Sequence, residues 1–480
     1  MSAQDIMSLL PVVILAGGIL FILLLVAVKR DHLTTFAATL LILTASLITV
    51  FFTSPETPHV IGELFLIDRF GYYYLALILL ATLVVAIFSY LSLRDFFPEK
   101  RMEEYYLLLM LATLGSAMMV FSTHFISFFV SLEILSVSLY ALIAYYRERT
   151  KAIEAGLKYL MLAAMSSSFL LLGMALVYAI SGTMAFHSLA SISPALSATS
   201  NLMLIAGIAL MIVGIGFKLA AVPFHMWTPD VYEGASSPIS AFIATVSKGS
   251  IVALLLRFFI LADLYRFEKI LWAFTVISIL SMLIGNLLAL MQNNVKRILA
   301  YSSIAHFGYL LVALIAGKEM GPPAATFYLT VYVITILAAF GIISLLSQSQ
   351  EEATDIEDYR GLFWKRPFLA AAFTVSLLSL AGIPITAGFI GKFFVLTAGV
   401  GTAKWLLAFT LVIGSVIGLY YYLQIIVVMM KQEINTVPTA RFSKASSLLA
   451  GSLALIILTV LMIWIGVYPR WLVDIVNSLG

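Results

Sequence analysis

Six ionisable residues lie inside long apolar segments, where no water is at hand to solvate a charge. They are Glu133, Lys158, Lys218, Lys248, Arg257 and Lys392. A charge near the centre of a bilayer costs about 2.5–3.5 kcal/mol on insertion scales, so such residues normally face the protein interior and mark ion or proton routes. We therefore expect the chemistry of this chain at these positions.

Three of these residues are too deep to reach the membrane surface. Glu133 lies about eight residues into its segment, which is roughly 12 Å at 1.5 Å per residue. Lys248 is about equally deep from the opposite side, and Lys218 is deeper. Desolvation favours a neutral amine, whereas a nearby carboxylate favours the ammonium. Movement of Glu133 toward or away from a lysine would therefore make that lysine hold or release a proton, so the pattern predicts a proton relay.

Other candidates have simpler interpretations. Lys158 follows Glu154 by one turn and could simply pair with it, so position alone leaves a structural and a functional role equally open. Arg257 is expected to extend its guanidinium to the membrane surface. His225 and His306 are weaker relay candidates, because a lone histidine is more often a satisfied structural residue.

Two apolar segments contain helix-breaking residues close to a lysine. Pro223 follows Lys218 closely, and Pro384, flanked by glycines, precedes Lys392. Proline removes a backbone hydrogen bond, and non-helical backbone at membrane depth is tolerated only where protein or water surrounds it. Two interrupted spans, each with a lysine, are typical of transporters built from repeats.

The elements that must position these residues are membrane-spanning helices. Of the 480 residues, 62% are hydrophobic and 11% are charged, whereas a soluble domain carries about 25% charged residues. Apolar runs near 20 residues, each long enough to span a bilayer core of roughly 30 Å, recur along the chain. The sequence predicts an all-α integral membrane protein with fourteen spans, at 8–28, 35–53, 71–93, 105–121, 125–145, 152–181, 203–223, 239–260, 270–290, 298–316, 324–348, 368–396, 405–429 and 448–468.

The composition also excludes several kinds of site. Cysteine is absent, which rules out disulfides, thiolate metal sites and cysteine-bound iron–sulfur clusters within this chain. No Gly-rich dinucleotide fingerprint follows a strand, because no strands are predicted. The first apolar run has no basic segment before it and is followed by Lys29 and Arg30, so we interpret it as a retained span rather than a signal peptide.

Basic residues outside the spans are distributed asymmetrically. Loops after odd-numbered spans hold Lys29, Arg30, Arg94, Lys100, Arg101, Arg147, Arg149, Lys151, Lys296, Arg297, Arg360, Lys365, Arg366, Lys431, Arg441 and Lys444. The other loops and the C-terminal tail hold only Arg69, Arg266, Lys269, Lys318, Lys404 and Arg470. By the positive-inside rule, the first set is cytoplasmic and both termini face outward.

One loop, residues 349–367, carries an acidic run. Its acids are Glu351, Glu352, Asp355, Glu357 and Asp358. We expect this run to be a solvated face rather than a docking patch.

Three long motifs carry a resemblance to a known family: GFKLAAVPFHMWTPDVYEGASSP, NVKRILAYSSIAHFGYLLVAL, and YRGLFWKRP followed by LLSLAGIPITAGFIGKFFVL. Over nearly its whole length the chain resembles the antiporter-like membrane subunits of respiratory complex I, an NADH-quinone oxidoreductase, and most of all the subunit N branch. The resemblance implies two inverted five-helix repeats, spans 4–8 and 9–13, with discontinuous helices 7 and 12. Lys218 and Lys392 lie on those two spans.

The resemblance implies a role for each deep charge. Glu133 would be the modulating carboxylate paired with Lys218, and Lys158 would lie near that pair. Lys248 would link the half-channels across the membrane centre, and Lys392 would pass the proton toward the outer side. The central polar axis of the family also includes histidines, which implies relay roles for the two histidines named above, His225 and His306.

The implied organisation is a single polytopic membrane domain, 1–480. It would comprise N-terminal helices 1–3 (1–104), the first repeat (105–260), the inverted repeat (270–430), and helix 14 with the tail (448–480). No cofactor is expected in this chain; FMN, iron–sulfur clusters and quinone would belong to partner subunits. The implied partners are the sister antiporter-like subunit M, small membrane subunits and the lipid bilayer of a bacterial inner membrane, with no nucleic acid.

Alternatives remain open. Sister M typically has glutamate where this chain has Lys392, and sister L continues into a long lateral helix, so the N branch fits better than either. A subunit of a multi-subunit sodium/proton antiporter is the nearest alternative. A stand-alone carrier of organic solutes would also use broken helices, but no cluster of substrate-specific polar groups is evident. A structural membrane spacer would tolerate leucine at every deep lysine.

Overall fold

The computed structural model describes residues 3–53, 57–96, 102–190, 197–347, 352–432 and 448–479. Within these ranges thirteen helices are long and apolar enough to cross a membrane. Two shorter apolar helices, α16 (Pro367–Ala381) and α17 (Ala387–Gly401), together occupy the twelfth expected span. The prediction of an all-α membrane protein with about fourteen spans is confirmed. The charged residues Glu351, Lys100, Arg101, Arg441 and Lys444 lie outside the described residues.

The N-terminal part contains four helices and one hairpin. The elements are α1 (Ala3–Ser8), α2 (Leu10–Val28), α3 (His32–Thr53), β1 (His59–Ile61), β2 (Phe65–Ile67) and α4 (Arg69–Phe96). The strands pair antiparallel, with His59 opposite Ile67. The short hairpin was not predicted from the sequence.

The remaining elements follow in two groups. The first comprises α5 (Glu104–Phe121), α6 (Phe125–Ile143), α7 (Thr150–Ser181), η1 (Phe186–Leu189), α8 (Ala198–Leu219), α9 (Trp227–Gly234), α10 (Ser237–Phe242), the π-helix η2 (Ile243–Ser247), α11 (Lys248–Leu261) and η3 (Leu264–Arg266). The second comprises α12 (Glu268–Leu290), α13 (Val295–Ile315), α14 (Gly321–Leu346), η4 (Ile356–Tyr359), α15 (Leu362–Lys365), α16, α17, α18 (Trp405–Met430), α19 (Leu448–Val467) and α20 (Arg470–Asn477).

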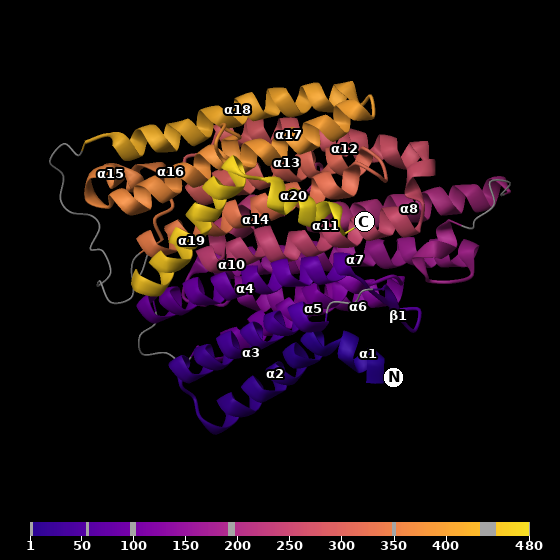
Figure 1. Cartoon of the computed structure of the whole chain (residues 1–480), viewed down its shortest axis with the longest axis horizontal. Coiled ribbons are helices and arrows are strands. Elements are labelled where there is room, and N and C mark those ends of the chain that lie inside the picture. Colours follow the sequence, from indigo (N-terminus) through magenta and orange to yellow (C-terminus); the bar gives the residue numbers. More distant parts are fainter. Residues whose placement is uncertain are drawn as a thin grey trace.

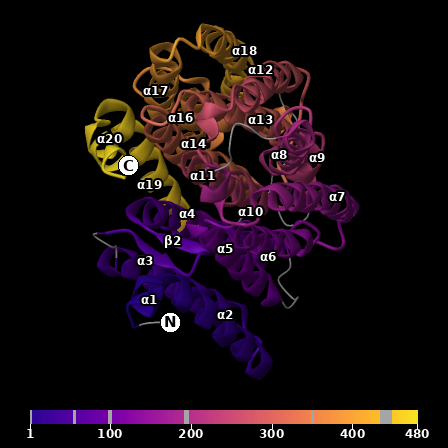
Figure 2. The same ribbon diagram turned by 90° about the vertical axis from the view of Figure 1, so that its right-hand side faces the viewer.

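The long helices run side by side along the longest axis of the molecule (Figure 1). Seen along that axis, α2 and α3 lie at one edge and α18 at the other (Figure 2). The segment Ser237–Leu261 is 100% buried over its apolar window, and α13 and α14 are 94% buried, against 33% for α3. The molecule thus has a central helix layer screened from lipid, where polar side chains can be solvated by protein.

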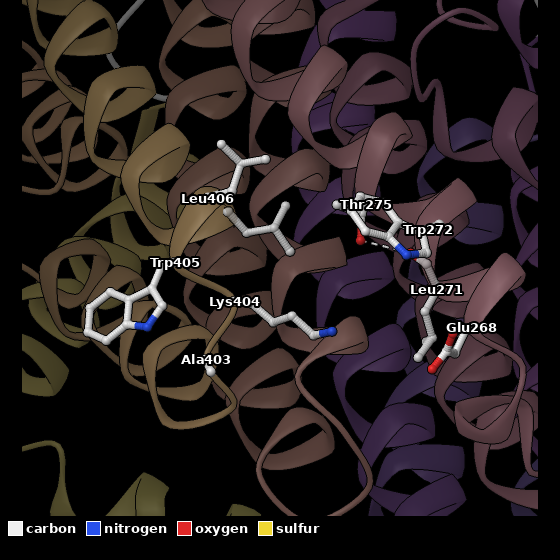
Figure 3. A pocket seen from close by; sticks show the side chains of 9 residues that line it. Glu268, Leu271, Trp272, Thr275, Ala403, Lys404, Trp405 and Leu406 are labelled. Atoms are coloured by element: carbon white, nitrogen blue, oxygen red, sulfur yellow. Dashed lines mark hydrogen bonds between the residues drawn. The ribbon is translucent and has the colours of Figure 1, made fainter.

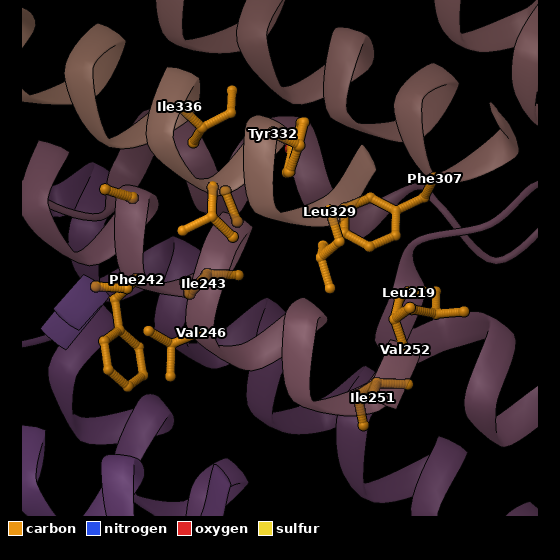
Figure 4. Close-up of a cluster of buried hydrophobic side chains, with 14 of the residues drawn as sticks. Leu219, Phe242, Ile243, Val246, Ile251, Val252, Phe307, Leu329, Tyr332 and Ile336 are labelled. Atoms are coloured by element: carbon orange, nitrogen blue, oxygen red, sulfur yellow. The ribbon is translucent and has the colours of Figure 1, made fainter. Parts of the chain in front are cut away.

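Apolar side chains fill the space between these central helices. Figure 4 shows residues of α11, α13 and α14 gathered around the end of α8, including Leu219, Val252, Phe307 and Leu329. Small residues let neighbouring helices approach closely. A Cβ on Gly173 of α7 would lie 2.6 Å from the carbonyl oxygen of Gly207 on α8.

One backbone arrangement occurs twice. An isolated antiparallel bridge joins the residue before α6 to the loop after α7, and another joins the residue before α13 to the loop after α14; the pairs are His124 with Ala185 and Asn294 with Asp355. A 3₁₀ helix follows each bridge: η1 after Ala185 and η4 after Asp355. The other residue of each bridge caps the long helix that it precedes: the His124 side chain accepts from Ile126 N of α6 at 3.2 Å, and the Asn294 side chain accepts from Arg297 N of α13 at 3.1 Å.

Candidate functional site

The Lys218 ammonium is buried in the last turn of α8 and contacts a serine of α6. Its Nζ donates to Ser136 Oγ at 2.6 Å, and Lys218 is 5% exposed. Ser136 donates its own proton to the Leu132 carbonyl at 2.6 Å, so its lone pairs are free for the ammonium. The Tyr159 ring centre lies 5.5 Å from Nζ. Lys218 is therefore solvated by protein rather than facing lipid.

Glu133 lies one turn before Ser136 on α6 and is partly buried. Its Oε1 accepts a hydrogen bond from Ser167 Oγ of α7 at 2.6 Å. Among the described residues no ion pair joins Glu133 to Lys218. The two groups occupy adjacent turns of the same site but are held by different serines.

The chain between α8 and α9 is not helical. Val222 N donates to Ser281 Oγ of α12 at 2.9 Å, and Trp227 Nε1 donates to the Phe217 carbonyl at 2.9 Å. The peptide bond before Pro223 is cis. The interruption expected beside Lys218 is therefore present, and side chains of the protein pair some of the freed backbone groups, as the absence of water in a bilayer requires.

Lys248 lies directly after the π-helix η2 and is 0% exposed. Its Nζ donates to Ser303 Oγ of α13 at 2.9 Å, and the Tyr332 hydroxyl of α14 donates to the same oxygen at 2.8 Å. The ring centre of Phe307 lies 4.8 Å from Nζ. π-Helical turns occur frequently at functional sites, and here the turn immediately precedes the buried amine.

His306 bridges two tyrosines in the core. Its Nδ1 lies 2.5 Å from the Tyr328 hydroxyl and its Nε2 lies 3.3 Å from the Tyr422 hydroxyl. The Tyr422 hydroxyl is also hydrogen-bonded to Ser302. His306 thus connects α13 with α14 and α18 through exchangeable protons.

Lys392 lies on α17, beside the break between α16 and α17. Its Nζ donates to the carbonyl of Ala381, the last residue of α16, at 2.8 Å. A cation at a helix C-terminus is stabilised by the helix dipole. The residue after Ala381 must be a glycine. Gly382 has a left-handed φ of +83°, and a Cβ at this position would lie 2.8 Å from Lys392 Cδ.

A small cavity connects Lys392 with the His306 cluster. It measures about 10 Å³, room for about one water molecule. Its polar lining consists of His306, Tyr328, Tyr332, Thr335, Ser379 and Lys392. Because Tyr332 also donates to Ser303, the hydrogen-bonded group around Lys248 reaches the same cavity that Lys392 lines.

An aromatic layer separates Lys218 from Lys248. The Trp227 ring centre lies 4.9 Å from that of Tyr159 and 5.9 Å from Lys248 Nζ. Among the described residues no hydrogen bond or ion pair crosses from one lysine to the other. We refer to Tyr159, Phe217 and Trp227 as the aromatic layer.

Lys158 does not contact the polar groups around Lys218 or those around Lys248 and Lys392 among the described residues. It is exposed, and its Nζ contacts Glu154 at 2.6 Å and Asp230 of α9 at 2.7 Å. Arg297 contacts Asp230 at 2.8 Å. Burial raises the pKa of Asp230, but hydrogen bonds from Lys158 and Arg297 outweigh it and lower that pKa below its usual value. The pairing with Glu154 that the sequence suggested is present.

The expectation that Arg257 reaches the membrane surface is wrong. Arg257 is 4% exposed, and its guanidinium donates to Asp68 at 2.9 and 2.7 Å and to the Val120 carbonyl at 3.0 Å. Asp68 precedes α4 and also accepts from Gly71 N. A bidentate partner across the helix bundle outcompetes water for the guanidinium, so Arg257 ties α11 to α4 and α5.

The expectation of a wholly solvated acidic run is wrong at Glu352. Its side chain is 4% exposed and lies 2.6 Å from Lys296 Nζ, which is fully buried. Lys296 also donates to the Ala235 carbonyl at 2.5 Å, at the end of α9, and Glu352 accepts from Ser237 N at 3.0 Å, at the start of α10. The pair thus caps both helices. Glu357, by contrast, is exposed, as expected.

His225 is buried beside the break after α8. Neither ring nitrogen has a hydrogen-bond partner among the described residues. The structure therefore does not join it to Lys218 or Lys248. No group of three or more His, Cys, Asp or Glu in the described part of the chain is arranged to hold a metal ion.

Sequence reasoning missed the hydroxyl groups that hold the buried amines. Ser136, Ser303, Tyr328 and Tyr422 each hydrogen-bond a lysine or histidine of the site, and Tyr332 donates to Ser303. One sequence pattern could have revealed such groups. Ser302, His306 and Tyr309 recur at helical spacing along an apolar span, which places three polar side chains on one face of α13, and this helix is 94% buried in the structure.

Comparison with known proteins identifies the family. A family model described as NADH:quinone oxidoreductase/Mrp antiporter, transmembrane, matches residues 122–418. The chain is 43% identical to NADH-quinone oxidoreductase subunit N of Ectopseudomonas mendocina, over 99% of this chain and 97% of the relative. The chain belongs to the subunit N family of NADH-quinone oxidoreductase. The resemblance seen in the three sequence motifs is confirmed.

Solved structures agree with this family. A chain of respiratory complex I from Thermus thermophilus, solved with bound aureothin, superposes with a TM-score of 0.83 at 31% identity, covering 98% of this chain and all of that chain. A chain of the Mrp complex from Dietzia shares the fold, with a TM-score of 0.85 at 22% identity and coverage of 100% and 97%. As a subunit N family member, the chain is a membrane subunit of NADH-quinone oxidoreductase in a bacterial inner membrane.

Proposed function

We propose that this subunit translocates protons through a buried Lys/Glu/His axis. The observation that carries the proposal is the burial of the deep lysines: Lys218, Lys248 and Lys392 are 5%, 0% and 8% exposed, and each is solvated by protein oxygen. Buried amines of this kind are costly in a membrane and mark ion or proton routes. Hydroxyl and imidazole groups beside them can exchange protons.

In this proposal Glu133 modulates Lys218, Lys248 links the two half-channels, and Lys392 passes the proton toward the outer side. His306 joins the second half of the axis through Tyr328 and the shared cavity. Lys158 and His225 would contribute only after a rearrangement, since neither contacts the other members in the described residues.

The spans of the axis are proposed to form two inverted repeats, spans 4–8 and 9–13, within residues 105–260 and 270–430. The recurrence of one bridge, one side-chain cap and one 3₁₀ helix supports this layout. Residues 1–104 and 448–480 would be additional helices outside the repeats.

The redox chemistry is proposed to occur elsewhere in the complex. FMN, iron–sulfur clusters and quinone would be held by partner subunits, and this chain would contact the sister subunit M and small membrane subunits. From the distribution of lysine and arginine, both termini would face the outer side.

The test is substitution within the assembled enzyme. Lys218→Ala or Glu133→Ala should lower coupled quinone reduction and proton pumping in membrane vesicles, whereas Lys269→Ala, at an exposed position, should change neither. Normal pumping and turnover in fully assembled Lys218→Ala and Glu133→Ala enzymes would refute these roles. Pumping that depends on Na⁺ would favour the sodium/proton antiporter alternative, and a chain that purifies alone would favour a solute carrier.

A further inference from the structure

A cleft opens between the first turns of α12 and the start of α18. It measures about 390 Å³, and its lining includes Glu268 and Trp272 of α12 together with Lys404 and Trp405 at the start of α18. Figure 3 shows the Lys404 side chain extending from the α18 side toward the α12 side, where Glu268 lies. The cleft lies away from the buried lysines, so the proton axis does not account for it.

The cleft holds one charge of each sign without an ion pair between them. Among the described residues, neither the Glu268 carboxylate nor the Lys404 ammonium has a hydrogen-bonding side-chain partner or an ion pair. Lys404 directly precedes α18, and Glu268 opens α12. The unpaired N–H groups and dipole of a helix N-terminus favour anions, and two such ends border the cleft. It therefore suits a ligand with separate anionic and cationic groups.

The surroundings place this cleft at the level of membrane headgroups. Trp272 and Trp405 are 64% and 53% exposed, and tryptophan is enriched at membrane–water interfaces. Below them, each helix presents exposed apolar side chains along the span: Val276, Leu280 and Leu287 on α12, and Phe409, Ile413 and Val416 on α18. These two faces would contact acyl chains that descend from the cleft.

We propose that the cleft binds the headgroup of a zwitterionic phospholipid with a primary ammonium, of the phosphatidylethanolamine type. Lys404 and the α18 N-terminus contact the phosphate, and Glu268 accepts hydrogen bonds from the ammonium. The two side chains carry no net charge together, so an anionic headgroup would meet repulsion from Glu268. A quaternary ammonium cannot donate a hydrogen bond to that carboxylate, which disfavours a choline headgroup.

The test uses the intact respiratory complex in lipid discs with a photoreactive phosphatidylethanolamine whose diazirine lies near the headgroup. Mass spectrometry of the digested chain should find label within 268–275 and 403–407. Unlabelled phosphatidylethanolamine should compete better than phosphatidylglycerol or phosphatidylcholine. Lys404→Gln and Glu268→Gln should each lower labelling about three- to fivefold, the range of a partly exposed ion pair, while Lys269→Gln, adjacent but outside the cleft, should not.

Three results would overturn the proposal. The first is equal competition by phosphatidylglycerol or phosphatidylcholine, and the second is labelling that both cleft substitutions leave unchanged. The third is photolabelling of another subunit while residues 268–275 and 403–407 of this chain stay unlabelled. The competition series uses the wild-type complex, so it decides the matter even where a substituted chain fails to assemble.

Discussion

Lys218 and Glu133 do not touch: the ammonium donates to Ser136, one turn further along α6 than the carboxylate, while Glu133 accepts from Ser167 on α7. The carboxylate therefore lies one turn from the group that holds the amine, and among the described residues no ion pair ties it to the amine. In the proposed function this separation lets Glu133 act as an adjustable charge. Ser136 is then the group that holds Lys218 in place.

Ser136→Ala tests that assignment. The substitution removes the acceptor of a buried ammonium, and a hydrogen bond to a charged group is worth about 1.5–3 kcal/mol. We expect coupled quinone reduction and pumping to fall about tenfold or more, measured in vesicles that contain fully assembled complex. Ser136→Thr should retain most activity because it keeps the hydroxyl. Ser138→Ala is the matched control, since within the described part of the chain Ser138 hydrogen-bonds only its own helix, at the Ile134 carbonyl. Normal pumping by Ser136→Ala would disprove the role.

Ser303 and Tyr332 should act as one unit around Lys248. Ser303→Ala and Tyr332→Phe each remove part of one hydrogen-bonded chain, so their effects on pumping should be strongly non-additive, with the double variant about as impaired as the worse single one. The measurement is a double-mutant cycle on initial pumping rates. Additive losses would mean that the two hydroxyls serve Lys248 independently.

Glu352 should stabilise the protein in a pH-dependent way. Burial raises the pKa of Glu352, but the charge and hydrogen bond of Lys296 outweigh it and lower the pKa below 4.5. A carboxyl with a lowered folded-state pKa contributes stability above its unfolded pKa and loses it as the pH falls through the folded value. Breaking a buried pair costs about 3–5 kcal/mol.

Glu352→Gln should therefore lower the thermal unfolding temperature of the detergent-solubilised complex at pH 7. The difference from wild type should shrink at pH values below about 4.5, the ordinary carboxyl pKa. Glu357→Gln is the control, because Glu357 is 63% exposed and its ion pair, with Arg360, is at the surface. A stability gap that stays constant down to pH 3 would contradict the assignment.

Gly388→Ala should disrupt the break between α16 and α17. A Cβ at this position would lie 1.8 Å from the Ser379 carbonyl oxygen. Overpacking of this kind costs typically 1–3 kcal/mol or more, so we expect poor assembly, or assembly with lost pumping, judged by native gel and vesicle assays. Gly17→Ala, where a Cβ would meet nothing within 4 Å, should behave as wild type. Normal assembly and pumping by Gly388→Ala would show that α16 and α17 can separate without cost.

The spans, the two helix breaks and the deep charged residues could be predicted because the bilayer imposes a strong rule on each. Apolar length identifies a span, and proline with glycine identifies a break. A charge in an apolar run also stands out at once. The structure buries all three deep lysines, Lys218, Lys248 and Lys392, beside polar partners. This agrees with the expectation that a charge in an apolar span faces the protein interior.

What hydropathy could not supply was the choice of partner. Glu352 lies within an acidic loop, and Lys296 lies at the start of an apolar helix, so nothing local to either sequence signals that they meet. Arg257 lies close to its helix end, where extension to the surface and pairing with Asp68 look identical in sequence. Partners such as these are fixed by contacts between segments far apart in the chain.

The aromatic layer of Tyr159, Phe217 and Trp227 has an electrical consequence for the proton path proposed above. A continuous file of exchangeable hydrogens from one membrane face to the other would short-circuit the potential that the respiratory chain maintains. In the proposed function, the rings between Lys218 and Lys248 would interrupt such a file at rest, and a proton would cross only when water or a moving side chain bridges the layer.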